Sequence, residues 1–267
     1  TVELDYEDVI EAGSGSASPD WVLVQPEIAK FARVCTYDRA GLGWSEVGPE
    51  PRGSQKYASE LHSLLEKAGE EPPYVLVAHS YGGHTVRIYT QAHAEEVIGM
   101  VLVDARLPTD EIPTGSMSSG EMKLWGFLAR CGFFRLMGKQ VMTSMAPALF
   151  ENIPDYPIPI VWAPKFFENN RLQSETTAES DQQVRETGPF GDLLLVVIMH
   201  GVPDMFFHLP PDEMAAAEAQ VQNGQRELTN LSTNSQFLIA EGSGHNIPVE
   251  NPDIIIDVVR DMIVAYR

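Results

Sequence analysis

Short, nearly unbroken runs of apolar residues alternate along the chain with segments of helical periodicity. The runs are rich in valine, isoleucine and leucine, and they end at glycine-containing or acidic turns. Continuous apolar runs of this length are typical of parallel strands that are buried on both faces. The pattern predicts strands over residues 9–12, 32–37, 74–78, 99–103, 193–199 and 236–240.

Helical patterns separate these runs. Residues 57–68 carry Leu61, Leu64 and Leu65 at a spacing that gathers them on one helix face. Residues 252–266 form an amphipathic pattern with a proline in the first turn, where proline is tolerated. The alternation of strands and helices predicts an α/β fold with a mostly parallel central sheet flanked by helices.

One long stretch interrupts the alternation. Residues 106–189 contain no strong strand pattern, and their aromatic residues lie on helical segments that prolines break. We interpret this stretch as a helical cap inserted between two strands of one sheet, with residues 1–105 and 190–267 forming the core. Aromatic residues at helical spacing would also suit an ordinary extension of the core.

Composition limits the partners of the chain. The sequence has 267 residues with 43% hydrophobic content, which is enough for one large domain with an insertion. The formal net charge of −20 repels nucleic acid and anionic membranes. We therefore expect a small-molecule substrate, no nucleic acid or membrane partner, and a monomer or homodimer.

Cysteine usage and hydropathy bear on the compartment. Cys35 and Cys131 are the two cysteines, and both stand in apolar runs, so we predict buried free thiols without metal-ligand spacing. This suits a reducing cytoplasmic setting. No stretch approaches the roughly eighteen apolar residues that span a bilayer, and no segment resembles a signal peptide, although the sequence starts at Thr1 rather than Met.

The strongest chemical motif is Ala-His-Ser-Tyr-Gly-Gly at residues 78–83, between an apolar run and a helical pattern. A serine at such a strand-to-helix turn is held up at the carboxyl edge of the sheet. The usual form is G-x-S-x-G, and Ala78 replaces the first glycine here. We predict Ser80 as a catalytic nucleophile.

A serine hydroxyl needs a base within hydrogen-bond reach, and that base needs an orienting carboxylate. Among the seven histidines, His245 follows the last predicted strand in Gly-Ser-Gly-His-Asn and so lies at the same sheet edge as Ser80. His79 fits a packing or hydrogen-bonding neighbour of the nucleophile. The role of His200, at the end of a strand, is left open.

Two aspartates are candidates for the acid. Asp104 ends the run 99–103, and Asp204 follows the run 193–199. Both precede His245, which gives the chain order Ser, Asp, His of this type of site. Asp104 is slightly favoured because its place at a strand end is more tightly fixed, but either aspartate can serve.

An oxyanion needs two preorganised N–H donors. One is expected from the backbone of Tyr81, the residue after the nucleophile. The second is expected from the glycine-rich loop 13–16, where we propose the backbone N–H of Ser14. A flexible turn is the simpler interpretation of that loop.

Taken together, the motifs at residues 37–45, 79–83, 101–104 and 243–245 resemble those of the α/β-hydrolase family, in the subgroup with an inserted helical cap. The resemblance implies an eight-stranded, mostly parallel sheet, a Ser-Asp-His triad, and a structural turn at residues 38–43 beside the oxyanion loop. Most members place the acid where Asp204 falls, and one type of haloalkane dehalogenase places it where Asp104 falls.

The chain also departs from that family. Ala12-Gly13 stands where His-Gly is usual, and about ten residues precede this loop where the family has a strand hairpin. Dehalogenases and epoxide hydrolases of this fold use an aspartate nucleophile, whereas Ser80 indicates acyl transfer to water.

The expected activity is hydrolysis of a small to medium apolar carboxylic ester or lactone through an acyl-enzyme, with no cofactor and no metal. The same triad can serve an amidase, a carbon–carbon hydrolase or a cofactor-free perhydrolase, since fold does not fix function. A non-catalytic ligand-binding protein is a further alternative.

Overall fold

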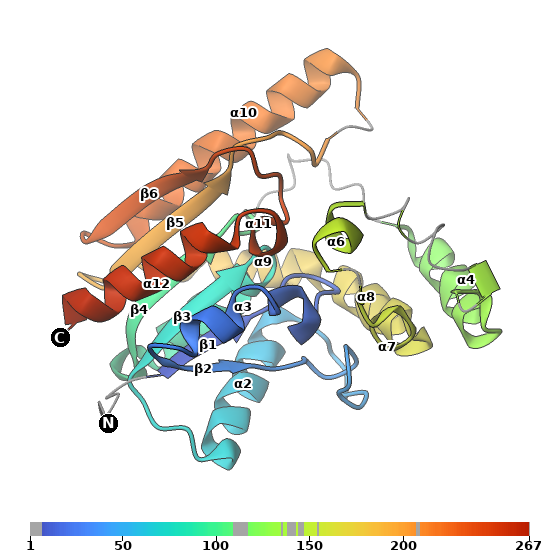
Figure 1. Ribbon diagram of the computed structural model, residues 1–267, viewed down its shortest axis with the longest axis horizontal. Helices are drawn as coiled ribbons and strands as arrows, with labels where there is room; N and C mark the ends of the chain where they lie inside the picture. The colour runs from blue at the N-terminus through green and yellow to red at the C-terminus, as the bar shows by residue number, and fades with distance from the viewer. Residues whose placement is uncertain are drawn as a thin grey trace.

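A parallel sheet forms the centre of the molecule. The computed structural model describes residues 7–108, 117–134, 136–137, 143, 147–153, 155–206 and 209–266. Its strands are β1 (Glu7–Glu11), β2 (Arg33–Thr36), β3 (Tyr74–His79), β4 (Val97–Val103), β5 (Leu194–His200) and β6 (Ser235–Ala240). They lie in the order β2-β1-β3-β4-β5-β6, and every neighbouring pair is parallel (Figure 1). All carboxyl ends therefore meet at one edge of the sheet.

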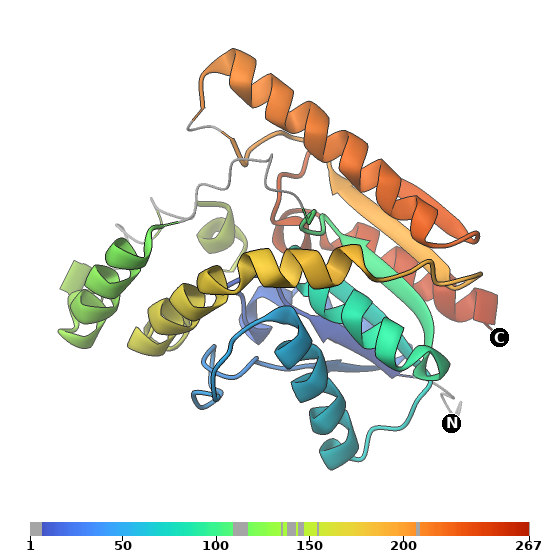
Figure 2. The same ribbon diagram turned by 180° about the vertical axis from the view of Figure 1, so that it is seen from behind.

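Helices cover both faces of the sheet. On one face, α1 (Gln25–Ile28) and α12 (Pro252–Tyr266) pack against side chains that alternate along the strands, among them Ile10 and Val101. On the other, α2 (Ser54–Ala68) and α3 (Gly82–Ala92) cover the intervening side chains, among them Leu76 and Leu102 (Figure 2). This alternation explains why the strands are apolar at nearly every position.

The predicted strands and helices are confirmed, with bounds that differ by a few residues. The predicted helix 252–266 coincides with α12, and the predicted helix 57–68 begins three residues earlier, at Ser54. The implied eight-stranded sheet differs from what is found, because the sheet of the described residues has six strands. Its first described strand, β1, leads directly into the loop that begins at Gly13.

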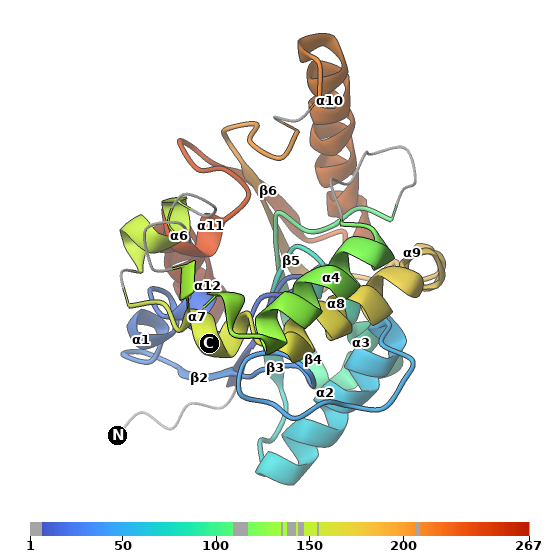
Figure 3. The same cartoon turned by 90° about the vertical axis from the view of Figure 1, so that its right-hand side faces the viewer.

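The insertion between β4 and β5 is helical in its described part. It contains α4 (Ser119–Arg130), α6 (Pro147–Asn152), α7 (Ile158–Val161), α8 (Pro164–Glu175) and α9 (Thr177–Arg185). Figure 3 faces this insertion, with α4 and α8 in front of the strands. Its aromatic side chains form a separate apolar cluster that includes Phe134, Phe150 and Phe167. The exact limits 106 and 189 remain a prediction.

The remaining elements complete the connections. They are η1 (Ser18–Trp21), η2 (Ala94–Glu96), α10 (Pro211–Glu227), η3 (Leu228–Leu231) and α11 (Ile247–Glu250). In the described ranges, no helix combines the length and apolar character that crossing a membrane requires.

The prediction of two buried thiols is wrong for Cys131. Both cysteines are free, but Cys131 is exposed and Cys35 is only half-buried. Cys131 caps the C-terminus of α4, a helix whose apolar residues extend beyond its packed face, since Leu124 and Phe127 are exposed as well. Cys35 lies on β2, an edge strand of the sheet, which is less completely covered than the central strands.

Candidate active site

The turn between β3 and α3 holds Ser80 in an unusual backbone conformation. Its φ is +52°, in the left-handed region that non-glycine residues rarely adopt. The carbonyl of Ser80 accepts hydrogen bonds from the backbone N–H groups of Gly83 at 3.1 Å and Arg106 at 2.9 Å. These bonds fix the sharp turn and hold the serine at the carboxyl edge of the sheet.

Gly82 allows α3 to approach β1 closely. A Cβ atom at this position would lie 2.6 Å from the carbonyl oxygen of Glu11 and 2.8 Å from that of Ala12, and both are backbone atoms. The small residue two places after the serine is therefore a packing requirement of the turn, as the motif indicates.

Gly82→Ala is expected to destabilise the protein by about 1–3 kcal/mol, because the backbone must move to admit the methyl group. The matched control is Gly120→Ala in α4, where an added Cβ meets nothing within 4 Å. Alanine there should be neutral or slightly stabilising, since it is the better helix former. Chemical denaturation followed by circular dichroism measures both, and equal stabilities would contradict the packing argument.

A hydrogen-bonded chain joins three of the predicted side chains. Ser80 Oγ lies 3.1 Å from His245 Nε2, and His245 Nδ1 lies 2.5 Å from Asp104 Oδ2. The three residues follow β3, β6 and β4, so the parallel sheet brings them to one edge. In this arrangement the imidazole can take a proton from the serine, while the carboxylate fixes its tautomer.

Asp104 is buried and strongly anchored. It is 2% exposed, and its φ of +41° is also left-handed. Its backbone N–H donates to the carbonyl of Ile198 at 2.6 Å. Burial alone would raise the pKa of Asp104, but hydrogen bonds from two imidazoles outweigh this effect and hold that pKa below the usual aspartate value. The group is therefore a carboxylate at neutral pH.

Asp204 contacts the backbone of the histidine loop instead. Its Oδ1 accepts the backbone N–H of His245 at 3.0 Å. The carboxylate of Glu250 accepts the neighbouring N–H of Gly244 at 2.6 Å. The carboxylates of Asp204 and Glu250 thus bind the backbone of the loop that carries His245, whereas the imidazole ring is hydrogen-bonded to Asp104.

His79 supports the same loop from the other side. Its Nε2 lies 2.8 Å from the carbonyl oxygen of His245, and the two rings lie 4.7 Å apart. Burial, more than any neighbouring charge, lowers the pKa of His79 to about 3. His79 is therefore neutral at physiological pH and donates one hydrogen bond to the loop, in agreement with a neighbouring role.

The glycine-rich loop after β1 passes directly beside the nucleophile. A Cβ atom on Gly13 would lie 3.2 Å from Ser80 Cβ. The guanidinium of Arg39 binds the carbonyl of Ala12 at 2.7 Å and also that of Gly13. Ser14 Oγ accepts a hydrogen bond from Gln173 of α8 at 2.6 Å. The loop is thus held from below by Arg39 and tied to the insertion above.

Tyr81 occupies the N-terminal cap position of α3, and its φ and ψ are −60° and −25°. The backbone N–H groups at the start of a helix lack intrahelical partners and carry partial positive charge. The phenol is buried, and its hydroxyl donates to Ser180 Oγ of α9 at 3.0 Å. The side chain of Tyr81 therefore bonds to the insertion, whereas its backbone lies at the start of α3, directly after Ser80.

Two contacts of the site were not predicted from the sequence: the pairing of His200 with Glu218, and the ion pair between Arg39, in the predicted turn 38–43, and Glu11. His200 ends β5 and binds Asp104, and Glu218 of α10 binds the other nitrogen of His200. Arg39 forms a buried ion pair of 2.5 Å with Glu11 beneath the glycine-rich loop. His200 was visible as a histidine at a strand end, but the pattern of α10 gives no indication that Glu218 is buried.

A cavity of about 220 Å³ opens beside these residues. His79 and Asn246, which neighbour Ser80 and His245 in sequence, form part of its wall. Much of the remaining wall is aromatic or aliphatic, and the residues concerned are Trp21, Leu149, Tyr156, Trp162, Phe166, Pro248 and Val249. Such a wall suits an apolar group of modest size.

Buried polar contacts fix one end of the insertion to the core. His84 Nε2 of α3 lies 2.7 Å from Asp181 Oδ1 of α9, and Arg106 donates to the same carboxylate at 3.0 Å. Ser180 accepts the backbone N–H of Ser54 at 3.1 Å. The helix α9 is therefore bonded to α3, the helix that begins just after Ser80.

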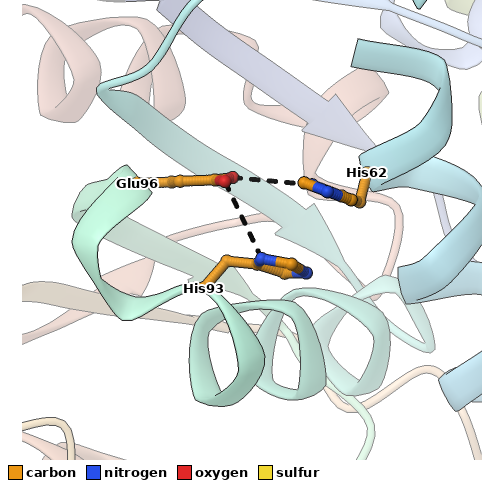
Figure 4. A group of neighbouring side chains, drawn as sticks. All are labelled: His62, His93 and Glu96. Carbon is orange, nitrogen blue, oxygen red and sulfur yellow. Dashed lines mark ion pairs between the residues drawn. The ribbon is translucent and has the colours of Figure 1, made fainter. Parts of the chain in front are cut away.

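Two groups of side chains in the described part of the chain have donor atoms close enough to hold a metal ion. In the first, Glu96 lies 3.7 Å from Nδ1 of both His62 and His93 (Figure 4). The two rings stack with centroids 4.0 Å apart and an angle of 15°. The lone pairs of near-parallel rings do not converge, so one ring must turn before both could bind zinc.

The second group is formed by Glu7, Cys35 and Glu70. Glu7 already accepts from Cys35 Sγ at 2.8 Å, and Arg33 binds both carboxylates. Both groups are remote from Ser80. His93 follows the far end of α3, roughly 16 Å along the helix, and Glu7 lies at the opposite edge of the sheet.

Comparison with known families gives the decisive match. The family model described as "Alpha/beta hydrolase family" matches residues 12–258, which is most of the chain. The protein is a member of the α/β-hydrolase family. Its parallel sheet with a helical insertion agrees with this assignment.

Relatives and solved structures agree with this assignment. This α/β-hydrolase is 26% identical to the uncharacterized protein YqjL of Bacillus subtilis, over 95% of this chain and 82% of YqjL. It resembles a thermophilic esterase from Thermogutta terrifontis with 20% identity and a TM-score of 0.67, over 98% and 90% of the two chains. The enol-lactonase of Burkholderia xenovorans LB400 gives 16% identity and a TM-score of 0.67, over 97% and 91%. At these identities the two structures support the fold alone.

Proposed function

We propose that this α/β-hydrolase cleaves small to medium apolar carboxylic esters or lactones, with Ser80 as nucleophile, His245 as base and Asp104 as acid. The observation that carries the proposal is the hydrogen-bonded chain from Ser80 Oγ through the imidazole of His245 to the buried carboxylate of Asp104, with separations of 3.1 and 2.5 Å. A non-catalytic binding protein has no need of these three groups in this order.

The reaction begins when Ser80 Oγ attacks the carbonyl carbon and its proton passes to His245 Nε2. The resulting imidazolium donates Nδ1–H to Asp104, which stabilises it without taking the proton. The tetrahedral intermediate collapses, and His245 gives the proton to the leaving alcohol. Water then attacks the acyl-enzyme with the same base, and the carboxylic acid leaves.

The oxyanion of each tetrahedral intermediate would be held by the backbone N–H groups of Tyr81 and Ser14. The cap position of Tyr81 at the start of α3 and the approach of Gly13 to Ser80 Cβ support this assignment. Arg39 fixes the loop by binding the carbonyls of residues 12 and 13, so the donor is preorganised before the substrate arrives.

Seven of the thirteen residues that line the cavity beside His79 are aromatic or aliphatic, and Asp20 is the one acidic residue among them, which supports a substrate with an apolar group. The cavity's volume of about 220 Å³ suits a small acyl or alcohol group. Residues of this chain alone supply the nucleophile, base, acid and donors, so the reaction as written needs no cofactor.

A fluorophosphonate probe tests the proposal, since it labels only serines that a base activates. We expect one probe per chain, mapped by peptide mass spectrometry to Ser80, and faster reaction of wild type than of unfolded protein. Ser80→Ala should not be labelled. The matched control Ser174→Ala removes an exposed serine of α8 and should be labelled like wild type.

Hydrolysis of p-nitrophenyl acetate and of a simple lactone measures turnover with the same proteins. Turnover that survives in Ser80→Ala, or a wild type that the probe does not label, would reject the proposal. A substrate panel that includes amides separates the ester hydrolase from the other reactions open to this triad.

A further inference from the structure

His200 presents a buried imidazole to two carboxylates. It is the last residue of β5 and is 0% exposed. Its Nδ1 lies 2.8 Å from Asp104 Oδ1 and 2.9 Å from Oδ2, and its Nε2 lies 3.2 Å from both oxygens of Glu218. Each ring nitrogen therefore faces an acceptor that has no proton to offer in its ionised form.

This geometry requires two N–H groups on one ring. A neutral imidazole has one N–H and one lone pair, and a lone pair that faces a buried carboxylate is unfavourable. The imidazolium donates at both nitrogens. Burial alone would lower the pKa of His200, but hydrogen bonds to the carboxylates of Asp104 and Glu218 raise it to about 10. Geometry and charge thus agree on a cation at neutral pH.

We propose that His200 is a positioning residue, whose imidazolium shares the carboxylate of Asp104 with His245. As a result, His245 remains unprotonated, and able to act as base, at a lower pH than it would without His200. The inference rests on the proposed function for its kinetic consequence. It adds a second histidine and Glu218 to the site, and neither touches the substrate or the reacting atoms.

The reasoning concerns one shared atom. Asp104 Oδ2 accepts hydrogen bonds from His245 Nδ1 at 2.5 Å and from His200 Nδ1 at 2.9 Å. A carboxylate whose negative charge is already compensated by one cation attracts a second proton on the other imidazole less strongly. The imidazole and the backbone N–H of His200 both donate to Oδ1 and oppose rotation of the carboxylate, so Oδ2 remains directed at His245.

Other charges near His200 are few in the described part of the chain. Asp104 faces it from the end of β4 and Glu218 from α10, while His245 lies across the shared carboxylate. Gln222 of α10 donates to Glu218 Oε1 at 3.0 Å and is neutral. Glu218 is thus the counter-ion that keeps His200 charged, and Gln222 offers a neutral comparison on the same helix.

The first test is the pH dependence of kcat/KM for ester hydrolysis. In His200→Gln we expect the acid limb of the pH profile to move up by about one pH unit. At a pH on that limb, kcat/KM should fall about tenfold, whereas on the pH-independent plateau it should fall much less. The double variant His200→Gln/Glu218→Gln also removes the Glu218 carboxylate that the single variant leaves without its cation, and it should move the limb in the same direction. Gln222→Met, the matched control, should leave the limb where it is.

A merely structural role for His200 gives a different result. Activity would then fall by the same factor at every pH, and the acid limb would stay in place. An unmoved limb in both the single and the double variant would overturn the inference.

The second test does not depend on activity. In nitrogen-15 histidine-labelled wild type, correlation spectra of the ring nitrogens at about pH 8 should identify His200 as protonated at both nitrogens. Glu218→Gln should lower the pH at which it loses the second proton. A single-protonated His200 in wild type would overturn the inference.

Activity measurements and these spectra together distinguish a failure of the proposed function from a failure of the role given to His200. If Ser80 neither reacts with the probe nor turns over esters, the proposed function fails. The titration of the ring at position 245 in wild type and in His200→Gln then still tests the shared carboxylate. If esters are hydrolysed but neither the limb nor this titration moves, the proposed function stands and the role of His200 is wrong.

Discussion

Replacing Asp104 with asparagine is expected to lower kcat for ester hydrolysis by about four orders of magnitude while leaving the protein folded. An asparagine amide can donate to Nδ1 of His245, which leaves Nε2–H facing Ser80 and removes the base. Asparagine also tolerates left-handed backbone better than most residues, which suits the φ of +41° at this position.

Asp204→Asn is the matched control. The side-chain oxygen of asparagine can still accept the backbone N–H of His245, the contact that Asp204 makes at 3.0 Å. We therefore expect a loss of about tenfold or less, in line with a weakened rather than a missing hydrogen bond. Steady-state kinetics of the two variants, with circular dichroism as a check on folding, compares them. A large loss in Asp204→Asn beside a small one in Asp104→Asn would reverse the assignment of the acid.

The second large effect concerns stability. Glu11→Gln is expected to lower the free energy of unfolding by about 3–5 kcal/mol, because it leaves the cation of Arg39 buried without its counter-ion. The pair is 2.5 Å apart, and the side chains of Arg39 and Glu11 are 3% and 0% exposed. Such a loss is a large part of the roughly 5–15 kcal/mol that stabilises a typical domain.

An exposed ion pair provides the comparison. Glu175→Gln removes the partner of Arg171 on α8, where the Glu175 side chain is 49% exposed, and should change stability by less than about 1 kcal/mol. Guanidinium denaturation followed by tryptophan fluorescence measures both variants. Similar stabilities for the two would mean that water or another group compensates Arg39. Because Arg39 also holds the loop beside Ser80, we expect Glu11→Gln to lose activity too.

Much of the fold could be predicted because its strands are continuous apolar runs. The run at 236–240 differs from β6 by one residue, and that at 193–199 differs from β5 by one residue at each end. The serine turn was recognisable because its small residues are imposed by packing, as the close approach of Gly82 to the carbonyl of Glu11 explains.

The buried charges could not be predicted in the same way. β1 is buried throughout, although it contains Glu7, Asp8 and Glu11, residues that usually mark a surface. Glu11 is compatible with the interior because Arg39, 28 residues away in sequence, binds it. The pairing of Glu218 with His200 likewise depends on how α10 docks against β5. Tertiary contacts decide both cases, and no local pattern records them.

The anchoring of α9 bears on how a substrate reaches the nucleophile. Asp181 joins this helix to His84 and Arg106 of the core, and swinging α9 outward would break both contacts and leave the buried His84 without its partner, at a cost of about 1–3 kcal/mol. We therefore expect the substrate to enter and the product to leave on the other side of the cavity, where α6 and α11 border it through Leu149 and Val249. Bulky substitutions on that side should slow entry and release, whereas the same changes along α9 should leave passage unaffected.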